Sequence, residues 1–408
     1  VGLGWVISNE SFFEPLTNVI QYLKVRGTWG QVGNSQISGR RFAYLATVTD
    51  SSSTSYTFGK NMDQNYGTTA IDEYAVDVTW EVADKTDIGV DMRLLNNKLN
   101  LQFDYFKESR EGIYLRRSSI PSYVGMINNP YGNIGKVENK GFELSVNYAN
   151  SWGGDWSLSL MGNYSFNRNK VLEDDSTVVY PWQNTIGNKV GQRFGLVALG
   201  LFESYGEIAA SPVQTGDTRP GDIKYKDING DGKIDEYDKV PIGWGSVPEI
   251  MYGFGFSLGW KNLSLTAMFQ GAAHVDAMLS GEGVLPFSQG SSRGNLLSNI
   301  TDRWTEENPR QNAFYPRLSI GNINMNYEES TWWLKDTDYL RLKNIELSYR
   351  LPDHWMKRIH LDNARIFIQG VNLLTFSKFK LWDVELGDGR GAKYPNIGSV
   401  SLGINFNF

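Results

Sequence analysis

Residues 155–167 read DWSLSLMGNYSFN, and this stretch decides the fold because its side chains alternate in kind. Serine and asparagine occupy most of the odd positions, and large apolar side chains occupy most of the even ones, namely Trp156, Leu158, Leu160, Tyr164 and Phe166. A period of two is the mark of an extended strand with two unlike faces. The stretch therefore predicts a β-strand with one apolar and one polar side.

The same alternation recurs along the chain. It is clearest over 141–148, 252–260 and 399–408, where aromatic or aliphatic side chains oppose glycine and polar side chains. The strand predicted over 339–350 departs from it: Leu340 and Leu342 have one parity, and Ile345 and Leu347 have the other. A β-bulge near Lys343 and Asn344 would place all four side chains on one face.

The connections between these segments alternate in length. Short turns are predicted at 96–97, 151–154 and 261–262, and moderate ones at 9–20 and 351–363. Long polar loops are predicted near 31–83, 111–139, 168–249, 272–337 and 374–396. Outer-membrane barrels have short periplasmic turns and long extracellular loops. We therefore predict an all-β fold over 1–408, a transmembrane antiparallel β-barrel to which this chain contributes about eleven strands.

An open sheet of eleven strands is unstable in lipid, because each unpaired backbone group there costs several kcal/mol. Eleven is half of the 22 strands typical of plugged outer-membrane transporters. Residues 3–7 already read as a strand, and no signal peptide precedes them. We therefore expect that the chain is cut from a longer one and that further strands complete a 22-stranded barrel.

Composition narrows the classes of function. The 408 residues include 13% aromatic residues, 43 glycines and no cysteine, and the net charge is −6. Disulfides and thiolate sites are excluded, and a nucleic-acid partner is not indicated. No apolar run reaches 18 residues, which excludes transmembrane helices but not a barrel. The three histidines and scattered carboxylates form no recognisable catalytic motif, so we predict that the chain is not an enzyme.

Residues 227–238, DINGDGKIDEYD, match the spacing of an EF-hand-type calcium loop with glycine at its sixth position. A Ca²⁺ or Mg²⁺ ion there would be bound by the side chains of five residues and the backbone carbonyl of Lys233; the five are Asp227, Asn229, Asp231, Asp235 and Asp238. Position 12 is Asp rather than Glu, and neither flank is helical in pattern. The alternative is a polar turn without an ion, held by Asx-turns and glycine.

Tryptophans in the predicted long loops are candidates for contact with a ligand or partner: Trp182, Trp244 and Trp382. The pair Trp332–Trp333 invites the same interpretation. Packing among the loops is the alternative for all of them. Tryptophans near predicted strand ends, such as Trp156 and Trp260, suit an interfacial aromatic belt instead.

The chain resembles the SusC/RagA-like family of TonB-dependent transporters of Bacteroidetes outer membranes. The strings that carry the resemblance are GWVISNESF at 4–12, LKVRGTWGQVGN at 23–34, LLNNKL at 94–99, GKVENKGFEL at 135–144, DYLRLKN at 338–344, QGVNLLTF at 369–376 and the terminal Phe408. The resemblance implies a 22-stranded barrel around an N-terminal plug preceded by a TonB box, neither of which occurs in these residues. It also implies that Phe408 is the signal read by the barrel-assembly machinery.

The same resemblance implies active import of a nutrient, an oligosaccharide or, less often, a peptide. The expected partners are a SusD-like surface lipoprotein, the TonB–ExbB–ExbD complex acting through the N-terminal part, and outer-membrane lipid. Two alternatives remain at this point. One is a passive porin or surface adhesin, and the other is a soluble surface carbohydrate-binding β-sandwich.

Overall fold

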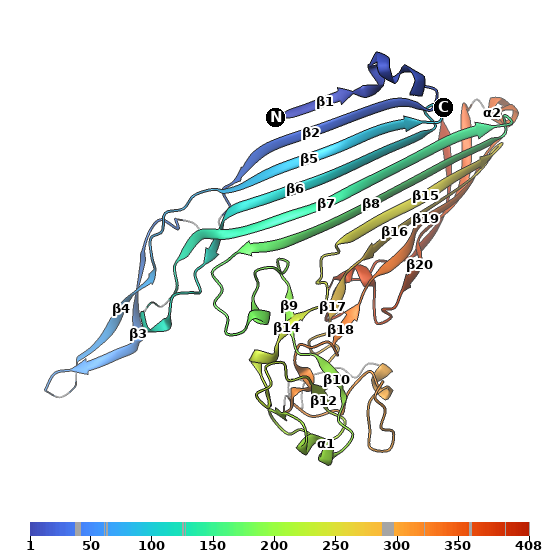
Figure 1. The fold of residues 1–408 in the computed structure, drawn as a ribbon. Helices are drawn as coiled ribbons and strands as arrows, with labels where there is room; N and C mark the ends of the chain where they lie inside the picture. Colours follow the sequence, from blue (N-terminus) through green and yellow to red (C-terminus); the bar gives the residue numbers. More distant parts are fainter. Residues whose placement is uncertain are drawn as a thin grey trace.

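A computed structural model describes residues 1–36, 42–60, 62, 64–124, 126, 128–287, 298–321, 323–358, 361–387 and 389–407. In the described residues, eleven antiparallel strands form one curved sheet, in which sequence neighbours pair (Figure 1). In order across the sheet they are β1 (Gly2–Val6), β2 (Ile20–Asn34), β5 (Glu81–Leu94), β6 (Leu99–Arg116), β7 (Tyr131–Trp152), β8 (Trp156–Glu173), β15 (Ile250–Trp260), β16 (Leu263–Ala273), β19 (Tyr339–Arg350), β20 (Asn363–Ser377) and β21 (Ser399–Asn407). The predicted strand number is confirmed, and the β-sandwich alternative is wrong because no second sheet packs face to face on this one among the described elements.

The register gives the sheet one apolar and one polar face. Leu160 pairs with Tyr148 on β7 and with Phe256 on β15, so three apolar side chains share a row. One residue along, Ser159 pairs with Ala149 and Ser257. Because side chains alternate across a strand, this pairing keeps the predicted apolar sets on a common outward face. The opposite face carries the small and polar set, which includes Ser159, Ala149 and Ser257.

The predicted bulge is confirmed. Met268 of β16 pairs with Asn344 of β19, but the next residue, Phe269, pairs with Leu342, which leaves Lys343 unpaired. The register between β19 and β20 shifts at the same place. Because of this extra residue, Leu340 and Leu342 lie on the same face of the sheet as Ile345 and Leu347.

One end of the sheet carries the short connections. Three consecutive residues between β5 and β6, Leu95, Asn96 and Asn97, have positive φ. Two 3₁₀ helices, η1 (Ile7–Asn9) and η2 (Ser11–Leu16), connect β1 to β2, and α2 (Asp353–Arg358) lies between β19 and β20. The described helices include none that is long and apolar enough to span a membrane.

The long connections lie at the other end and are shorter than predicted, because the strands continue past the apolar region. Strand β6 extends to Arg116 and β7 starts at Tyr131, inside the loop predicted for 111–139. Polar pairs extend these strands, as in the ion pair between Lys136 and Glu111. The first long connection contains a hairpin of β3 (Thr47–Phe58) and β4 (Gln64–Glu73), which projects away from the sheet (Figure 1).

Candidate functional site

Three of the long loops fold into one compact body at the end of the sheet, here named the loop body (described residues within 174–249, 274–338 and 378–398). Its short strands pair as β9 (Arg193–Gly195) with β14 (Val240–Ile242), β10 (Ala198–Leu201) with β12 (Ile223–Tyr225), β11 (Val213–Gln214) with β13 (Lys233–Ile234), and β17 (Asp276–Met278) with β18 (Leu334–Asp336); α1 (Tyr205–Ala209) lies beside them. Leu196, Ile223, Val284 and Trp333 are almost completely buried in a common apolar core. The loops therefore have a core of their own, separate from the outward apolar face of the sheet.

A buried carboxylate ties two of these loops together. Asp222 is 1% exposed and receives two hydrogen bonds of 2.9 Å from the guanidinium of Arg317. The side-chain amides of Asn324 and Asn326 also donate to it, over 3.2 and 2.8 Å. A buried charge with this many partners is stabilised only in one arrangement, so the pair fixes the relative position of the loops.

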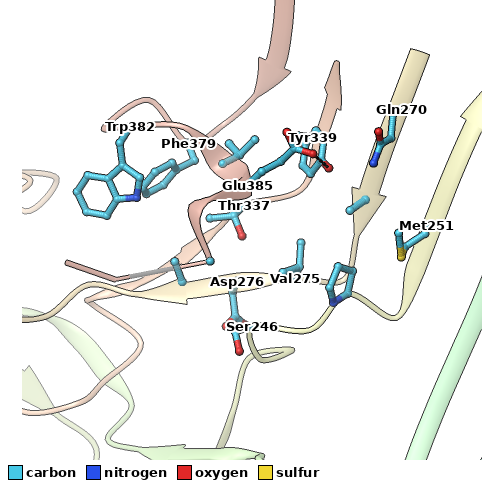
Figure 2. A pocket seen from close by; sticks show the side chains of 15 residues that line it. Ser246, Met251, Gln270, Val275, Asp276, Thr337, Tyr339, Phe379, Trp382 and Glu385 are labelled. Carbon is cyan, nitrogen blue, oxygen red and sulfur yellow. Dashed lines mark hydrogen bonds between the residues drawn. The ribbon is translucent and has the colours of Figure 1, made fainter. Parts of the chain in front are cut away.

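A cavity of about 250 Å³ lies where the loop body meets the polar face of β15, β16 and β19 (Figure 2). Phe379, Trp382 and Tyr339 supply aromatic surface to its lining. Thr337 and Glu385 supply hydrogen-bonding groups, together with Ser246 and Gln270. Aromatic surface combined with a few polar groups is the usual character of a pocket for a small organic ligand. Of the three predicted contact residues, only Trp382 lines this cavity.

An arginine of the barrel wall holds the last long loop over the cavity. Arg341 is 2% exposed and donates two hydrogen bonds of 2.9 Å to both carboxylate oxygens of Asp383. Its Nη1 lies 2.7 Å from Glu385 as an ion pair outside hydrogen-bond geometry, and Tyr339 donates a 2.8 Å hydrogen bond to the same carboxylate. Trp382 therefore precedes a segment that is anchored directly to β19.

Trp244 lies in a different environment. Its ring stacks on His274 with centroids 4.0 Å apart and 5° between the planes, and it is 42% exposed. Arg168 and Lys189 lie near the Trp244 ring, and the buried carboxylate of Glu249 contacts them at 2.7 and 3.1 Å. Burial raises the pKa of Glu249, but hydrogen bonds from Arg168, Lys189 and His274 outweigh it and lower the pKa to about 2. The carboxylate therefore contributes stability above the ordinary titration range of glutamate, and that contribution is lost as the pH falls toward 2.

Trp182 packs against the segment 227–238. Its ring stacks on Tyr180 with centroids 4.6 Å apart, and its indole N–H donates a 2.8 Å hydrogen bond to the carbonyl of Tyr237. The interpretation of Trp332–Trp333 as exposed ligand contacts is wrong for Trp333, which is 1% exposed in the core of the loop body. A sequence cannot separate such a tryptophan from an exposed one, because both lie in polar loops.

The predicted metal ligands accept hydrogen bonds from backbone amides. Asp227 accepts from Gly230 and Gly232 over 2.7 and 2.9 Å, and buried Asp238 accepts from Ile228 and Asp235 over 2.7 and 2.9 Å. Asn229, Asp231 and Asp235 each accept from the amide two residues later. Gly232 has a φ of +82°, as the sharp turn at position six requires. Throughout the described residues, no three His, Cys, Asp or Glu side chains converge as a group suited to a metal ion.

Metal binding by residues 227–238 stays a prediction, with a direct test. If Ca²⁺ binds there, protease cleavage within 227–238 is expected to slow about tenfold at free Ca²⁺ about tenfold above its Kd, because the ion stabilises the closed loop. Asp231→Ala should remove the protection, whereas Asp217→Ala, outside the motif, should keep it. Equal cleavage rates with Ca²⁺ and with chelator would show that hydrogen bonds alone hold the turn.

Several residues that shape the site carry no signal in the sequence. Arg341, Glu249 and Asp222 are buried charges whose ion-pair partners Asp383, Arg168 and Arg317 lie 42, 81 and 95 positions away. Single charged residues in strands or polar loops look ordinary until the fold brings them together. Phe408, the predicted assembly signal, lies outside the described residues.

Comparisons with known proteins agree with this architecture. The family model described as TonB dependent receptor-like, beta-barrel matches residues 1–373. TonB-dependent receptor P3 of Formosa agariphila is 28% identical over 434 residues, and TonB-dependent receptor SusC of Bacteroides thetaiotaomicron is 26% identical over 426 residues. Both alignments cover 100% of this chain, but 41% and 40% of the relatives.

A solved structure of the RagAB peptide transporter superimposes with a TM-score of 0.70 at 21% identity, over 100% of this chain and 43% of that one. This likeness shows a shared fold. The chain spans about two fifths of the length of the relatives it matches. The resemblance to SusC and RagA predicted from the sequence is confirmed. The chain thus belongs to the TonB-dependent receptor β-barrel family and is an outer-membrane β-barrel protein.

Proposed function

We propose that this chain forms part of a TonB-dependent importer that carries a nutrient actively across the outer membrane. The family match over residues 1–373 carries the proposal. The two-faced sheet supports it, since its polar face lines the inside of a barrel. The edges β1 and β21 leave backbone groups that lipid cannot satisfy, so further strands must pair with them. An enzymatic role is not part of the proposal.

An oligosaccharide is the proposed substrate class, with a peptide second. The cavity beside Trp382 and Tyr339 combines flat aromatic surface with hydrogen-bonding groups, which are those of Ser246, Gln270, Thr337 and the carboxylates of Asp276 and Glu385. Sugar rings present apolar faces and many hydroxyl groups, which suit such a lining. The relative named as a peptide transporter keeps a peptide in consideration. A SusD-like lipoprotein resting on the loop body and TonB–ExbB–ExbD energising the plug complete the proposed system.

Uptake of labelled oligosaccharides by cells that produce the full-length protein tests this function. We expect accumulation against a gradient that stops when an uncoupler removes the proton gradient or when TonB is deleted. Trp382→Ala should raise the oligosaccharide concentration that gives half-maximal uptake about tenfold. This is the effect of losing one aromatic contact and the area that it buries. Trp355→Ala is the matched control, because Trp355 is exposed on α2 at the opposite end of the barrel.

The alternatives predict different results. A passive porin would equilibrate the sugar without regard to the uncoupler, and an adhesin would bind cells or surfaces without any uptake. Labelled peptides taken up in place of oligosaccharides, with the same dependence on TonB, would keep the importer and overturn the substrate class.

A further inference from the structure

A row of cations crosses the outward face of the sheet where its apolar side chains end. Lys107 of β6 pairs with Lys140 of β7, and Lys140 pairs with Arg168 of β8. On the same face and two residues nearer the short-turn end, Tyr105 pairs with Phe142, which pairs with Phe166. The change from aromatic to cationic side chains therefore occurs at the same level on three adjacent strands.

The level of this row matches one boundary of the membrane. The outward-facing Trp156 and Phe166 are the first and last residues of an eleven-residue stretch of β8. A transmembrane strand needs about 9–11 residues to cross the hydrocarbon core. Trp156 lies beside the short-turn end, where its ring neighbours Trp260 at 5.9 Å. Arg168 therefore follows the last lipid-level residue at the end that carries the long loops, which is the level of the outer headgroups.

A recess of about 250 Å³ adjoins the row, lined by Arg168, Lys170, Lys189 and Trp244 among others. The guanidinium of Arg168 lies 5.4 Å from the ring centroid of Phe166, so it remains on the outward side. Lys189 and Arg168 also lie 5.4 and 5.9 Å from the ring of Trp244. Three cations and an exposed tryptophan thus surround a polar recess directly above the aromatic band.

Positive charge is in excess here. Glu138 contacts Lys107 at 2.7 Å and Lys140 at 3.4 Å, and Glu249 contacts Arg168 and Lys189. Two carboxylates thus face five cations when Lys170 is included. The side chains of Lys107, Lys140 and Arg168 are 50, 57 and 48% exposed, so their charged ends remain accessible from outside.

We propose that this cationic row and its recess bind the phosphorylated headgroup of a glycolipid in the outer leaflet. Phosphate groups accept strong hydrogen bonds from arginine and lysine, and the acyl chains of the lipid would lie along Tyr105, Phe142 and Phe166. A soluble anion gains nothing from those rings, so their position favours a lipid. The site lies on the face opposite the barrel lumen and is therefore independent of the proposed import route.

Native mass spectrometry of the full-length protein in detergent, with lipid A added, measures lipid binding and tests the site. In the double variant K140Q/K170Q, we expect roughly thirtyfold weaker binding of lipid A, the effect of two surface cations. The neutral glutamines preserve chain length, and heat-modifiable migration on a gel confirms that the variant is folded. The matched control is Lys261→Gln, which removes an exposed cation at the short-turn end.

Three comparisons decide the outcome. Weaker binding in the double variant but not in Lys261→Gln, together with loss of binding when lipid A is dephosphorylated, supports the proposal. Equal binding of lipid A by the unmodified protein, the double variant and Lys261→Gln overturns the proposal. Displacement of lipid A by inorganic phosphate or by the deacylated phosphorylated disaccharide at similar concentrations would also overturn it, because the site would then bind a free anion. If the double variant misfolds, the single variants Lys140→Gln and Lys170→Gln provide the same comparison, and K140R/K170R, which keeps both charges, should bind lipid A as the unmodified protein does.

Discussion

Replacing Arg341 by alanine is expected to release the loop over 378–396 from the barrel wall. The substitution leaves Asp383, whose side chain is 10% exposed, without its buried cation, while Glu385 keeps Lys343 at 3.6 Å as a cationic partner. Removing one partner of a buried ion pair costs about 3–5 kcal/mol, because the remaining charge is desolvated and unpaired. This cost destabilises the loop in its position on the barrel wall relative to the released loop. Native-state proteolysis within 378–396 should therefore accelerate about a hundredfold or more.

The same strand offers the control. Arg350 contacts Asp353 at 3.2 Å, but both side chains are more than half exposed, so Arg350→Ala should cost no more than about 1 kcal/mol. Arg341→Lys should recover only part of the stability, because lysine keeps the charge but has a single nitrogen, whereas Arg341 contacts Asp383 and Glu385 through two different nitrogens. If the two alanine variants are cleaved at the same rate, the loop is held by its apolar contacts and not by Arg341.

The barrel wall was predictable because each strand carries its own signal. Alternation along 155–167 defined both faces without any knowledge of neighbouring strands, and the broken parity of Leu342 and Ile345 located the bulge at Lys343. Strand ends were less predictable. Beyond the lipid, pairs such as Lys136 with Glu111 continue the sheet with polar residues on both faces, and the alternation disappears.

The loop body was not predictable for a different reason. Its strands are two to four residues long, too short for any period to appear. Its contacts join distant segments, as when the amide of Leu196 donates to the carbonyl of Glu329. Trp382, which the sequence predicts to contact a ligand or partner, lines a cavity, but Phe379 and Tyr339 in the same lining come from a loop and a strand whose approach only the fold reveals.

Replacing Leu160 by arginine is expected to destabilise the barrel by about 2–4 kcal/mol, the cost of a cation near the middle of the lipid-facing surface. Leu160 is 42% exposed and lies in the middle of the outward apolar row, between Tyr148 and Phe256 on the adjacent strands. Its two paired neighbours carry no charge to balance the guanidinium, and Trp156 and Phe166 separate it from both membrane surfaces. Equilibrium unfolding of the full-length protein from lipid vesicles measures the effect.

Ser159→Arg is the matched control, because it places the same side chain one position away and on the opposite face. There the neighbours are Ala149 and Ser257, and the charged end reaches the watery interior, so the expected loss is below about 1 kcal/mol. The difference between these two variants, and not either value alone, reports which face meets lipid. Equal losses would mean that both faces meet the same environment, and a larger loss for Ser159→Arg would mean that the sheet is oriented with its apolar side inward.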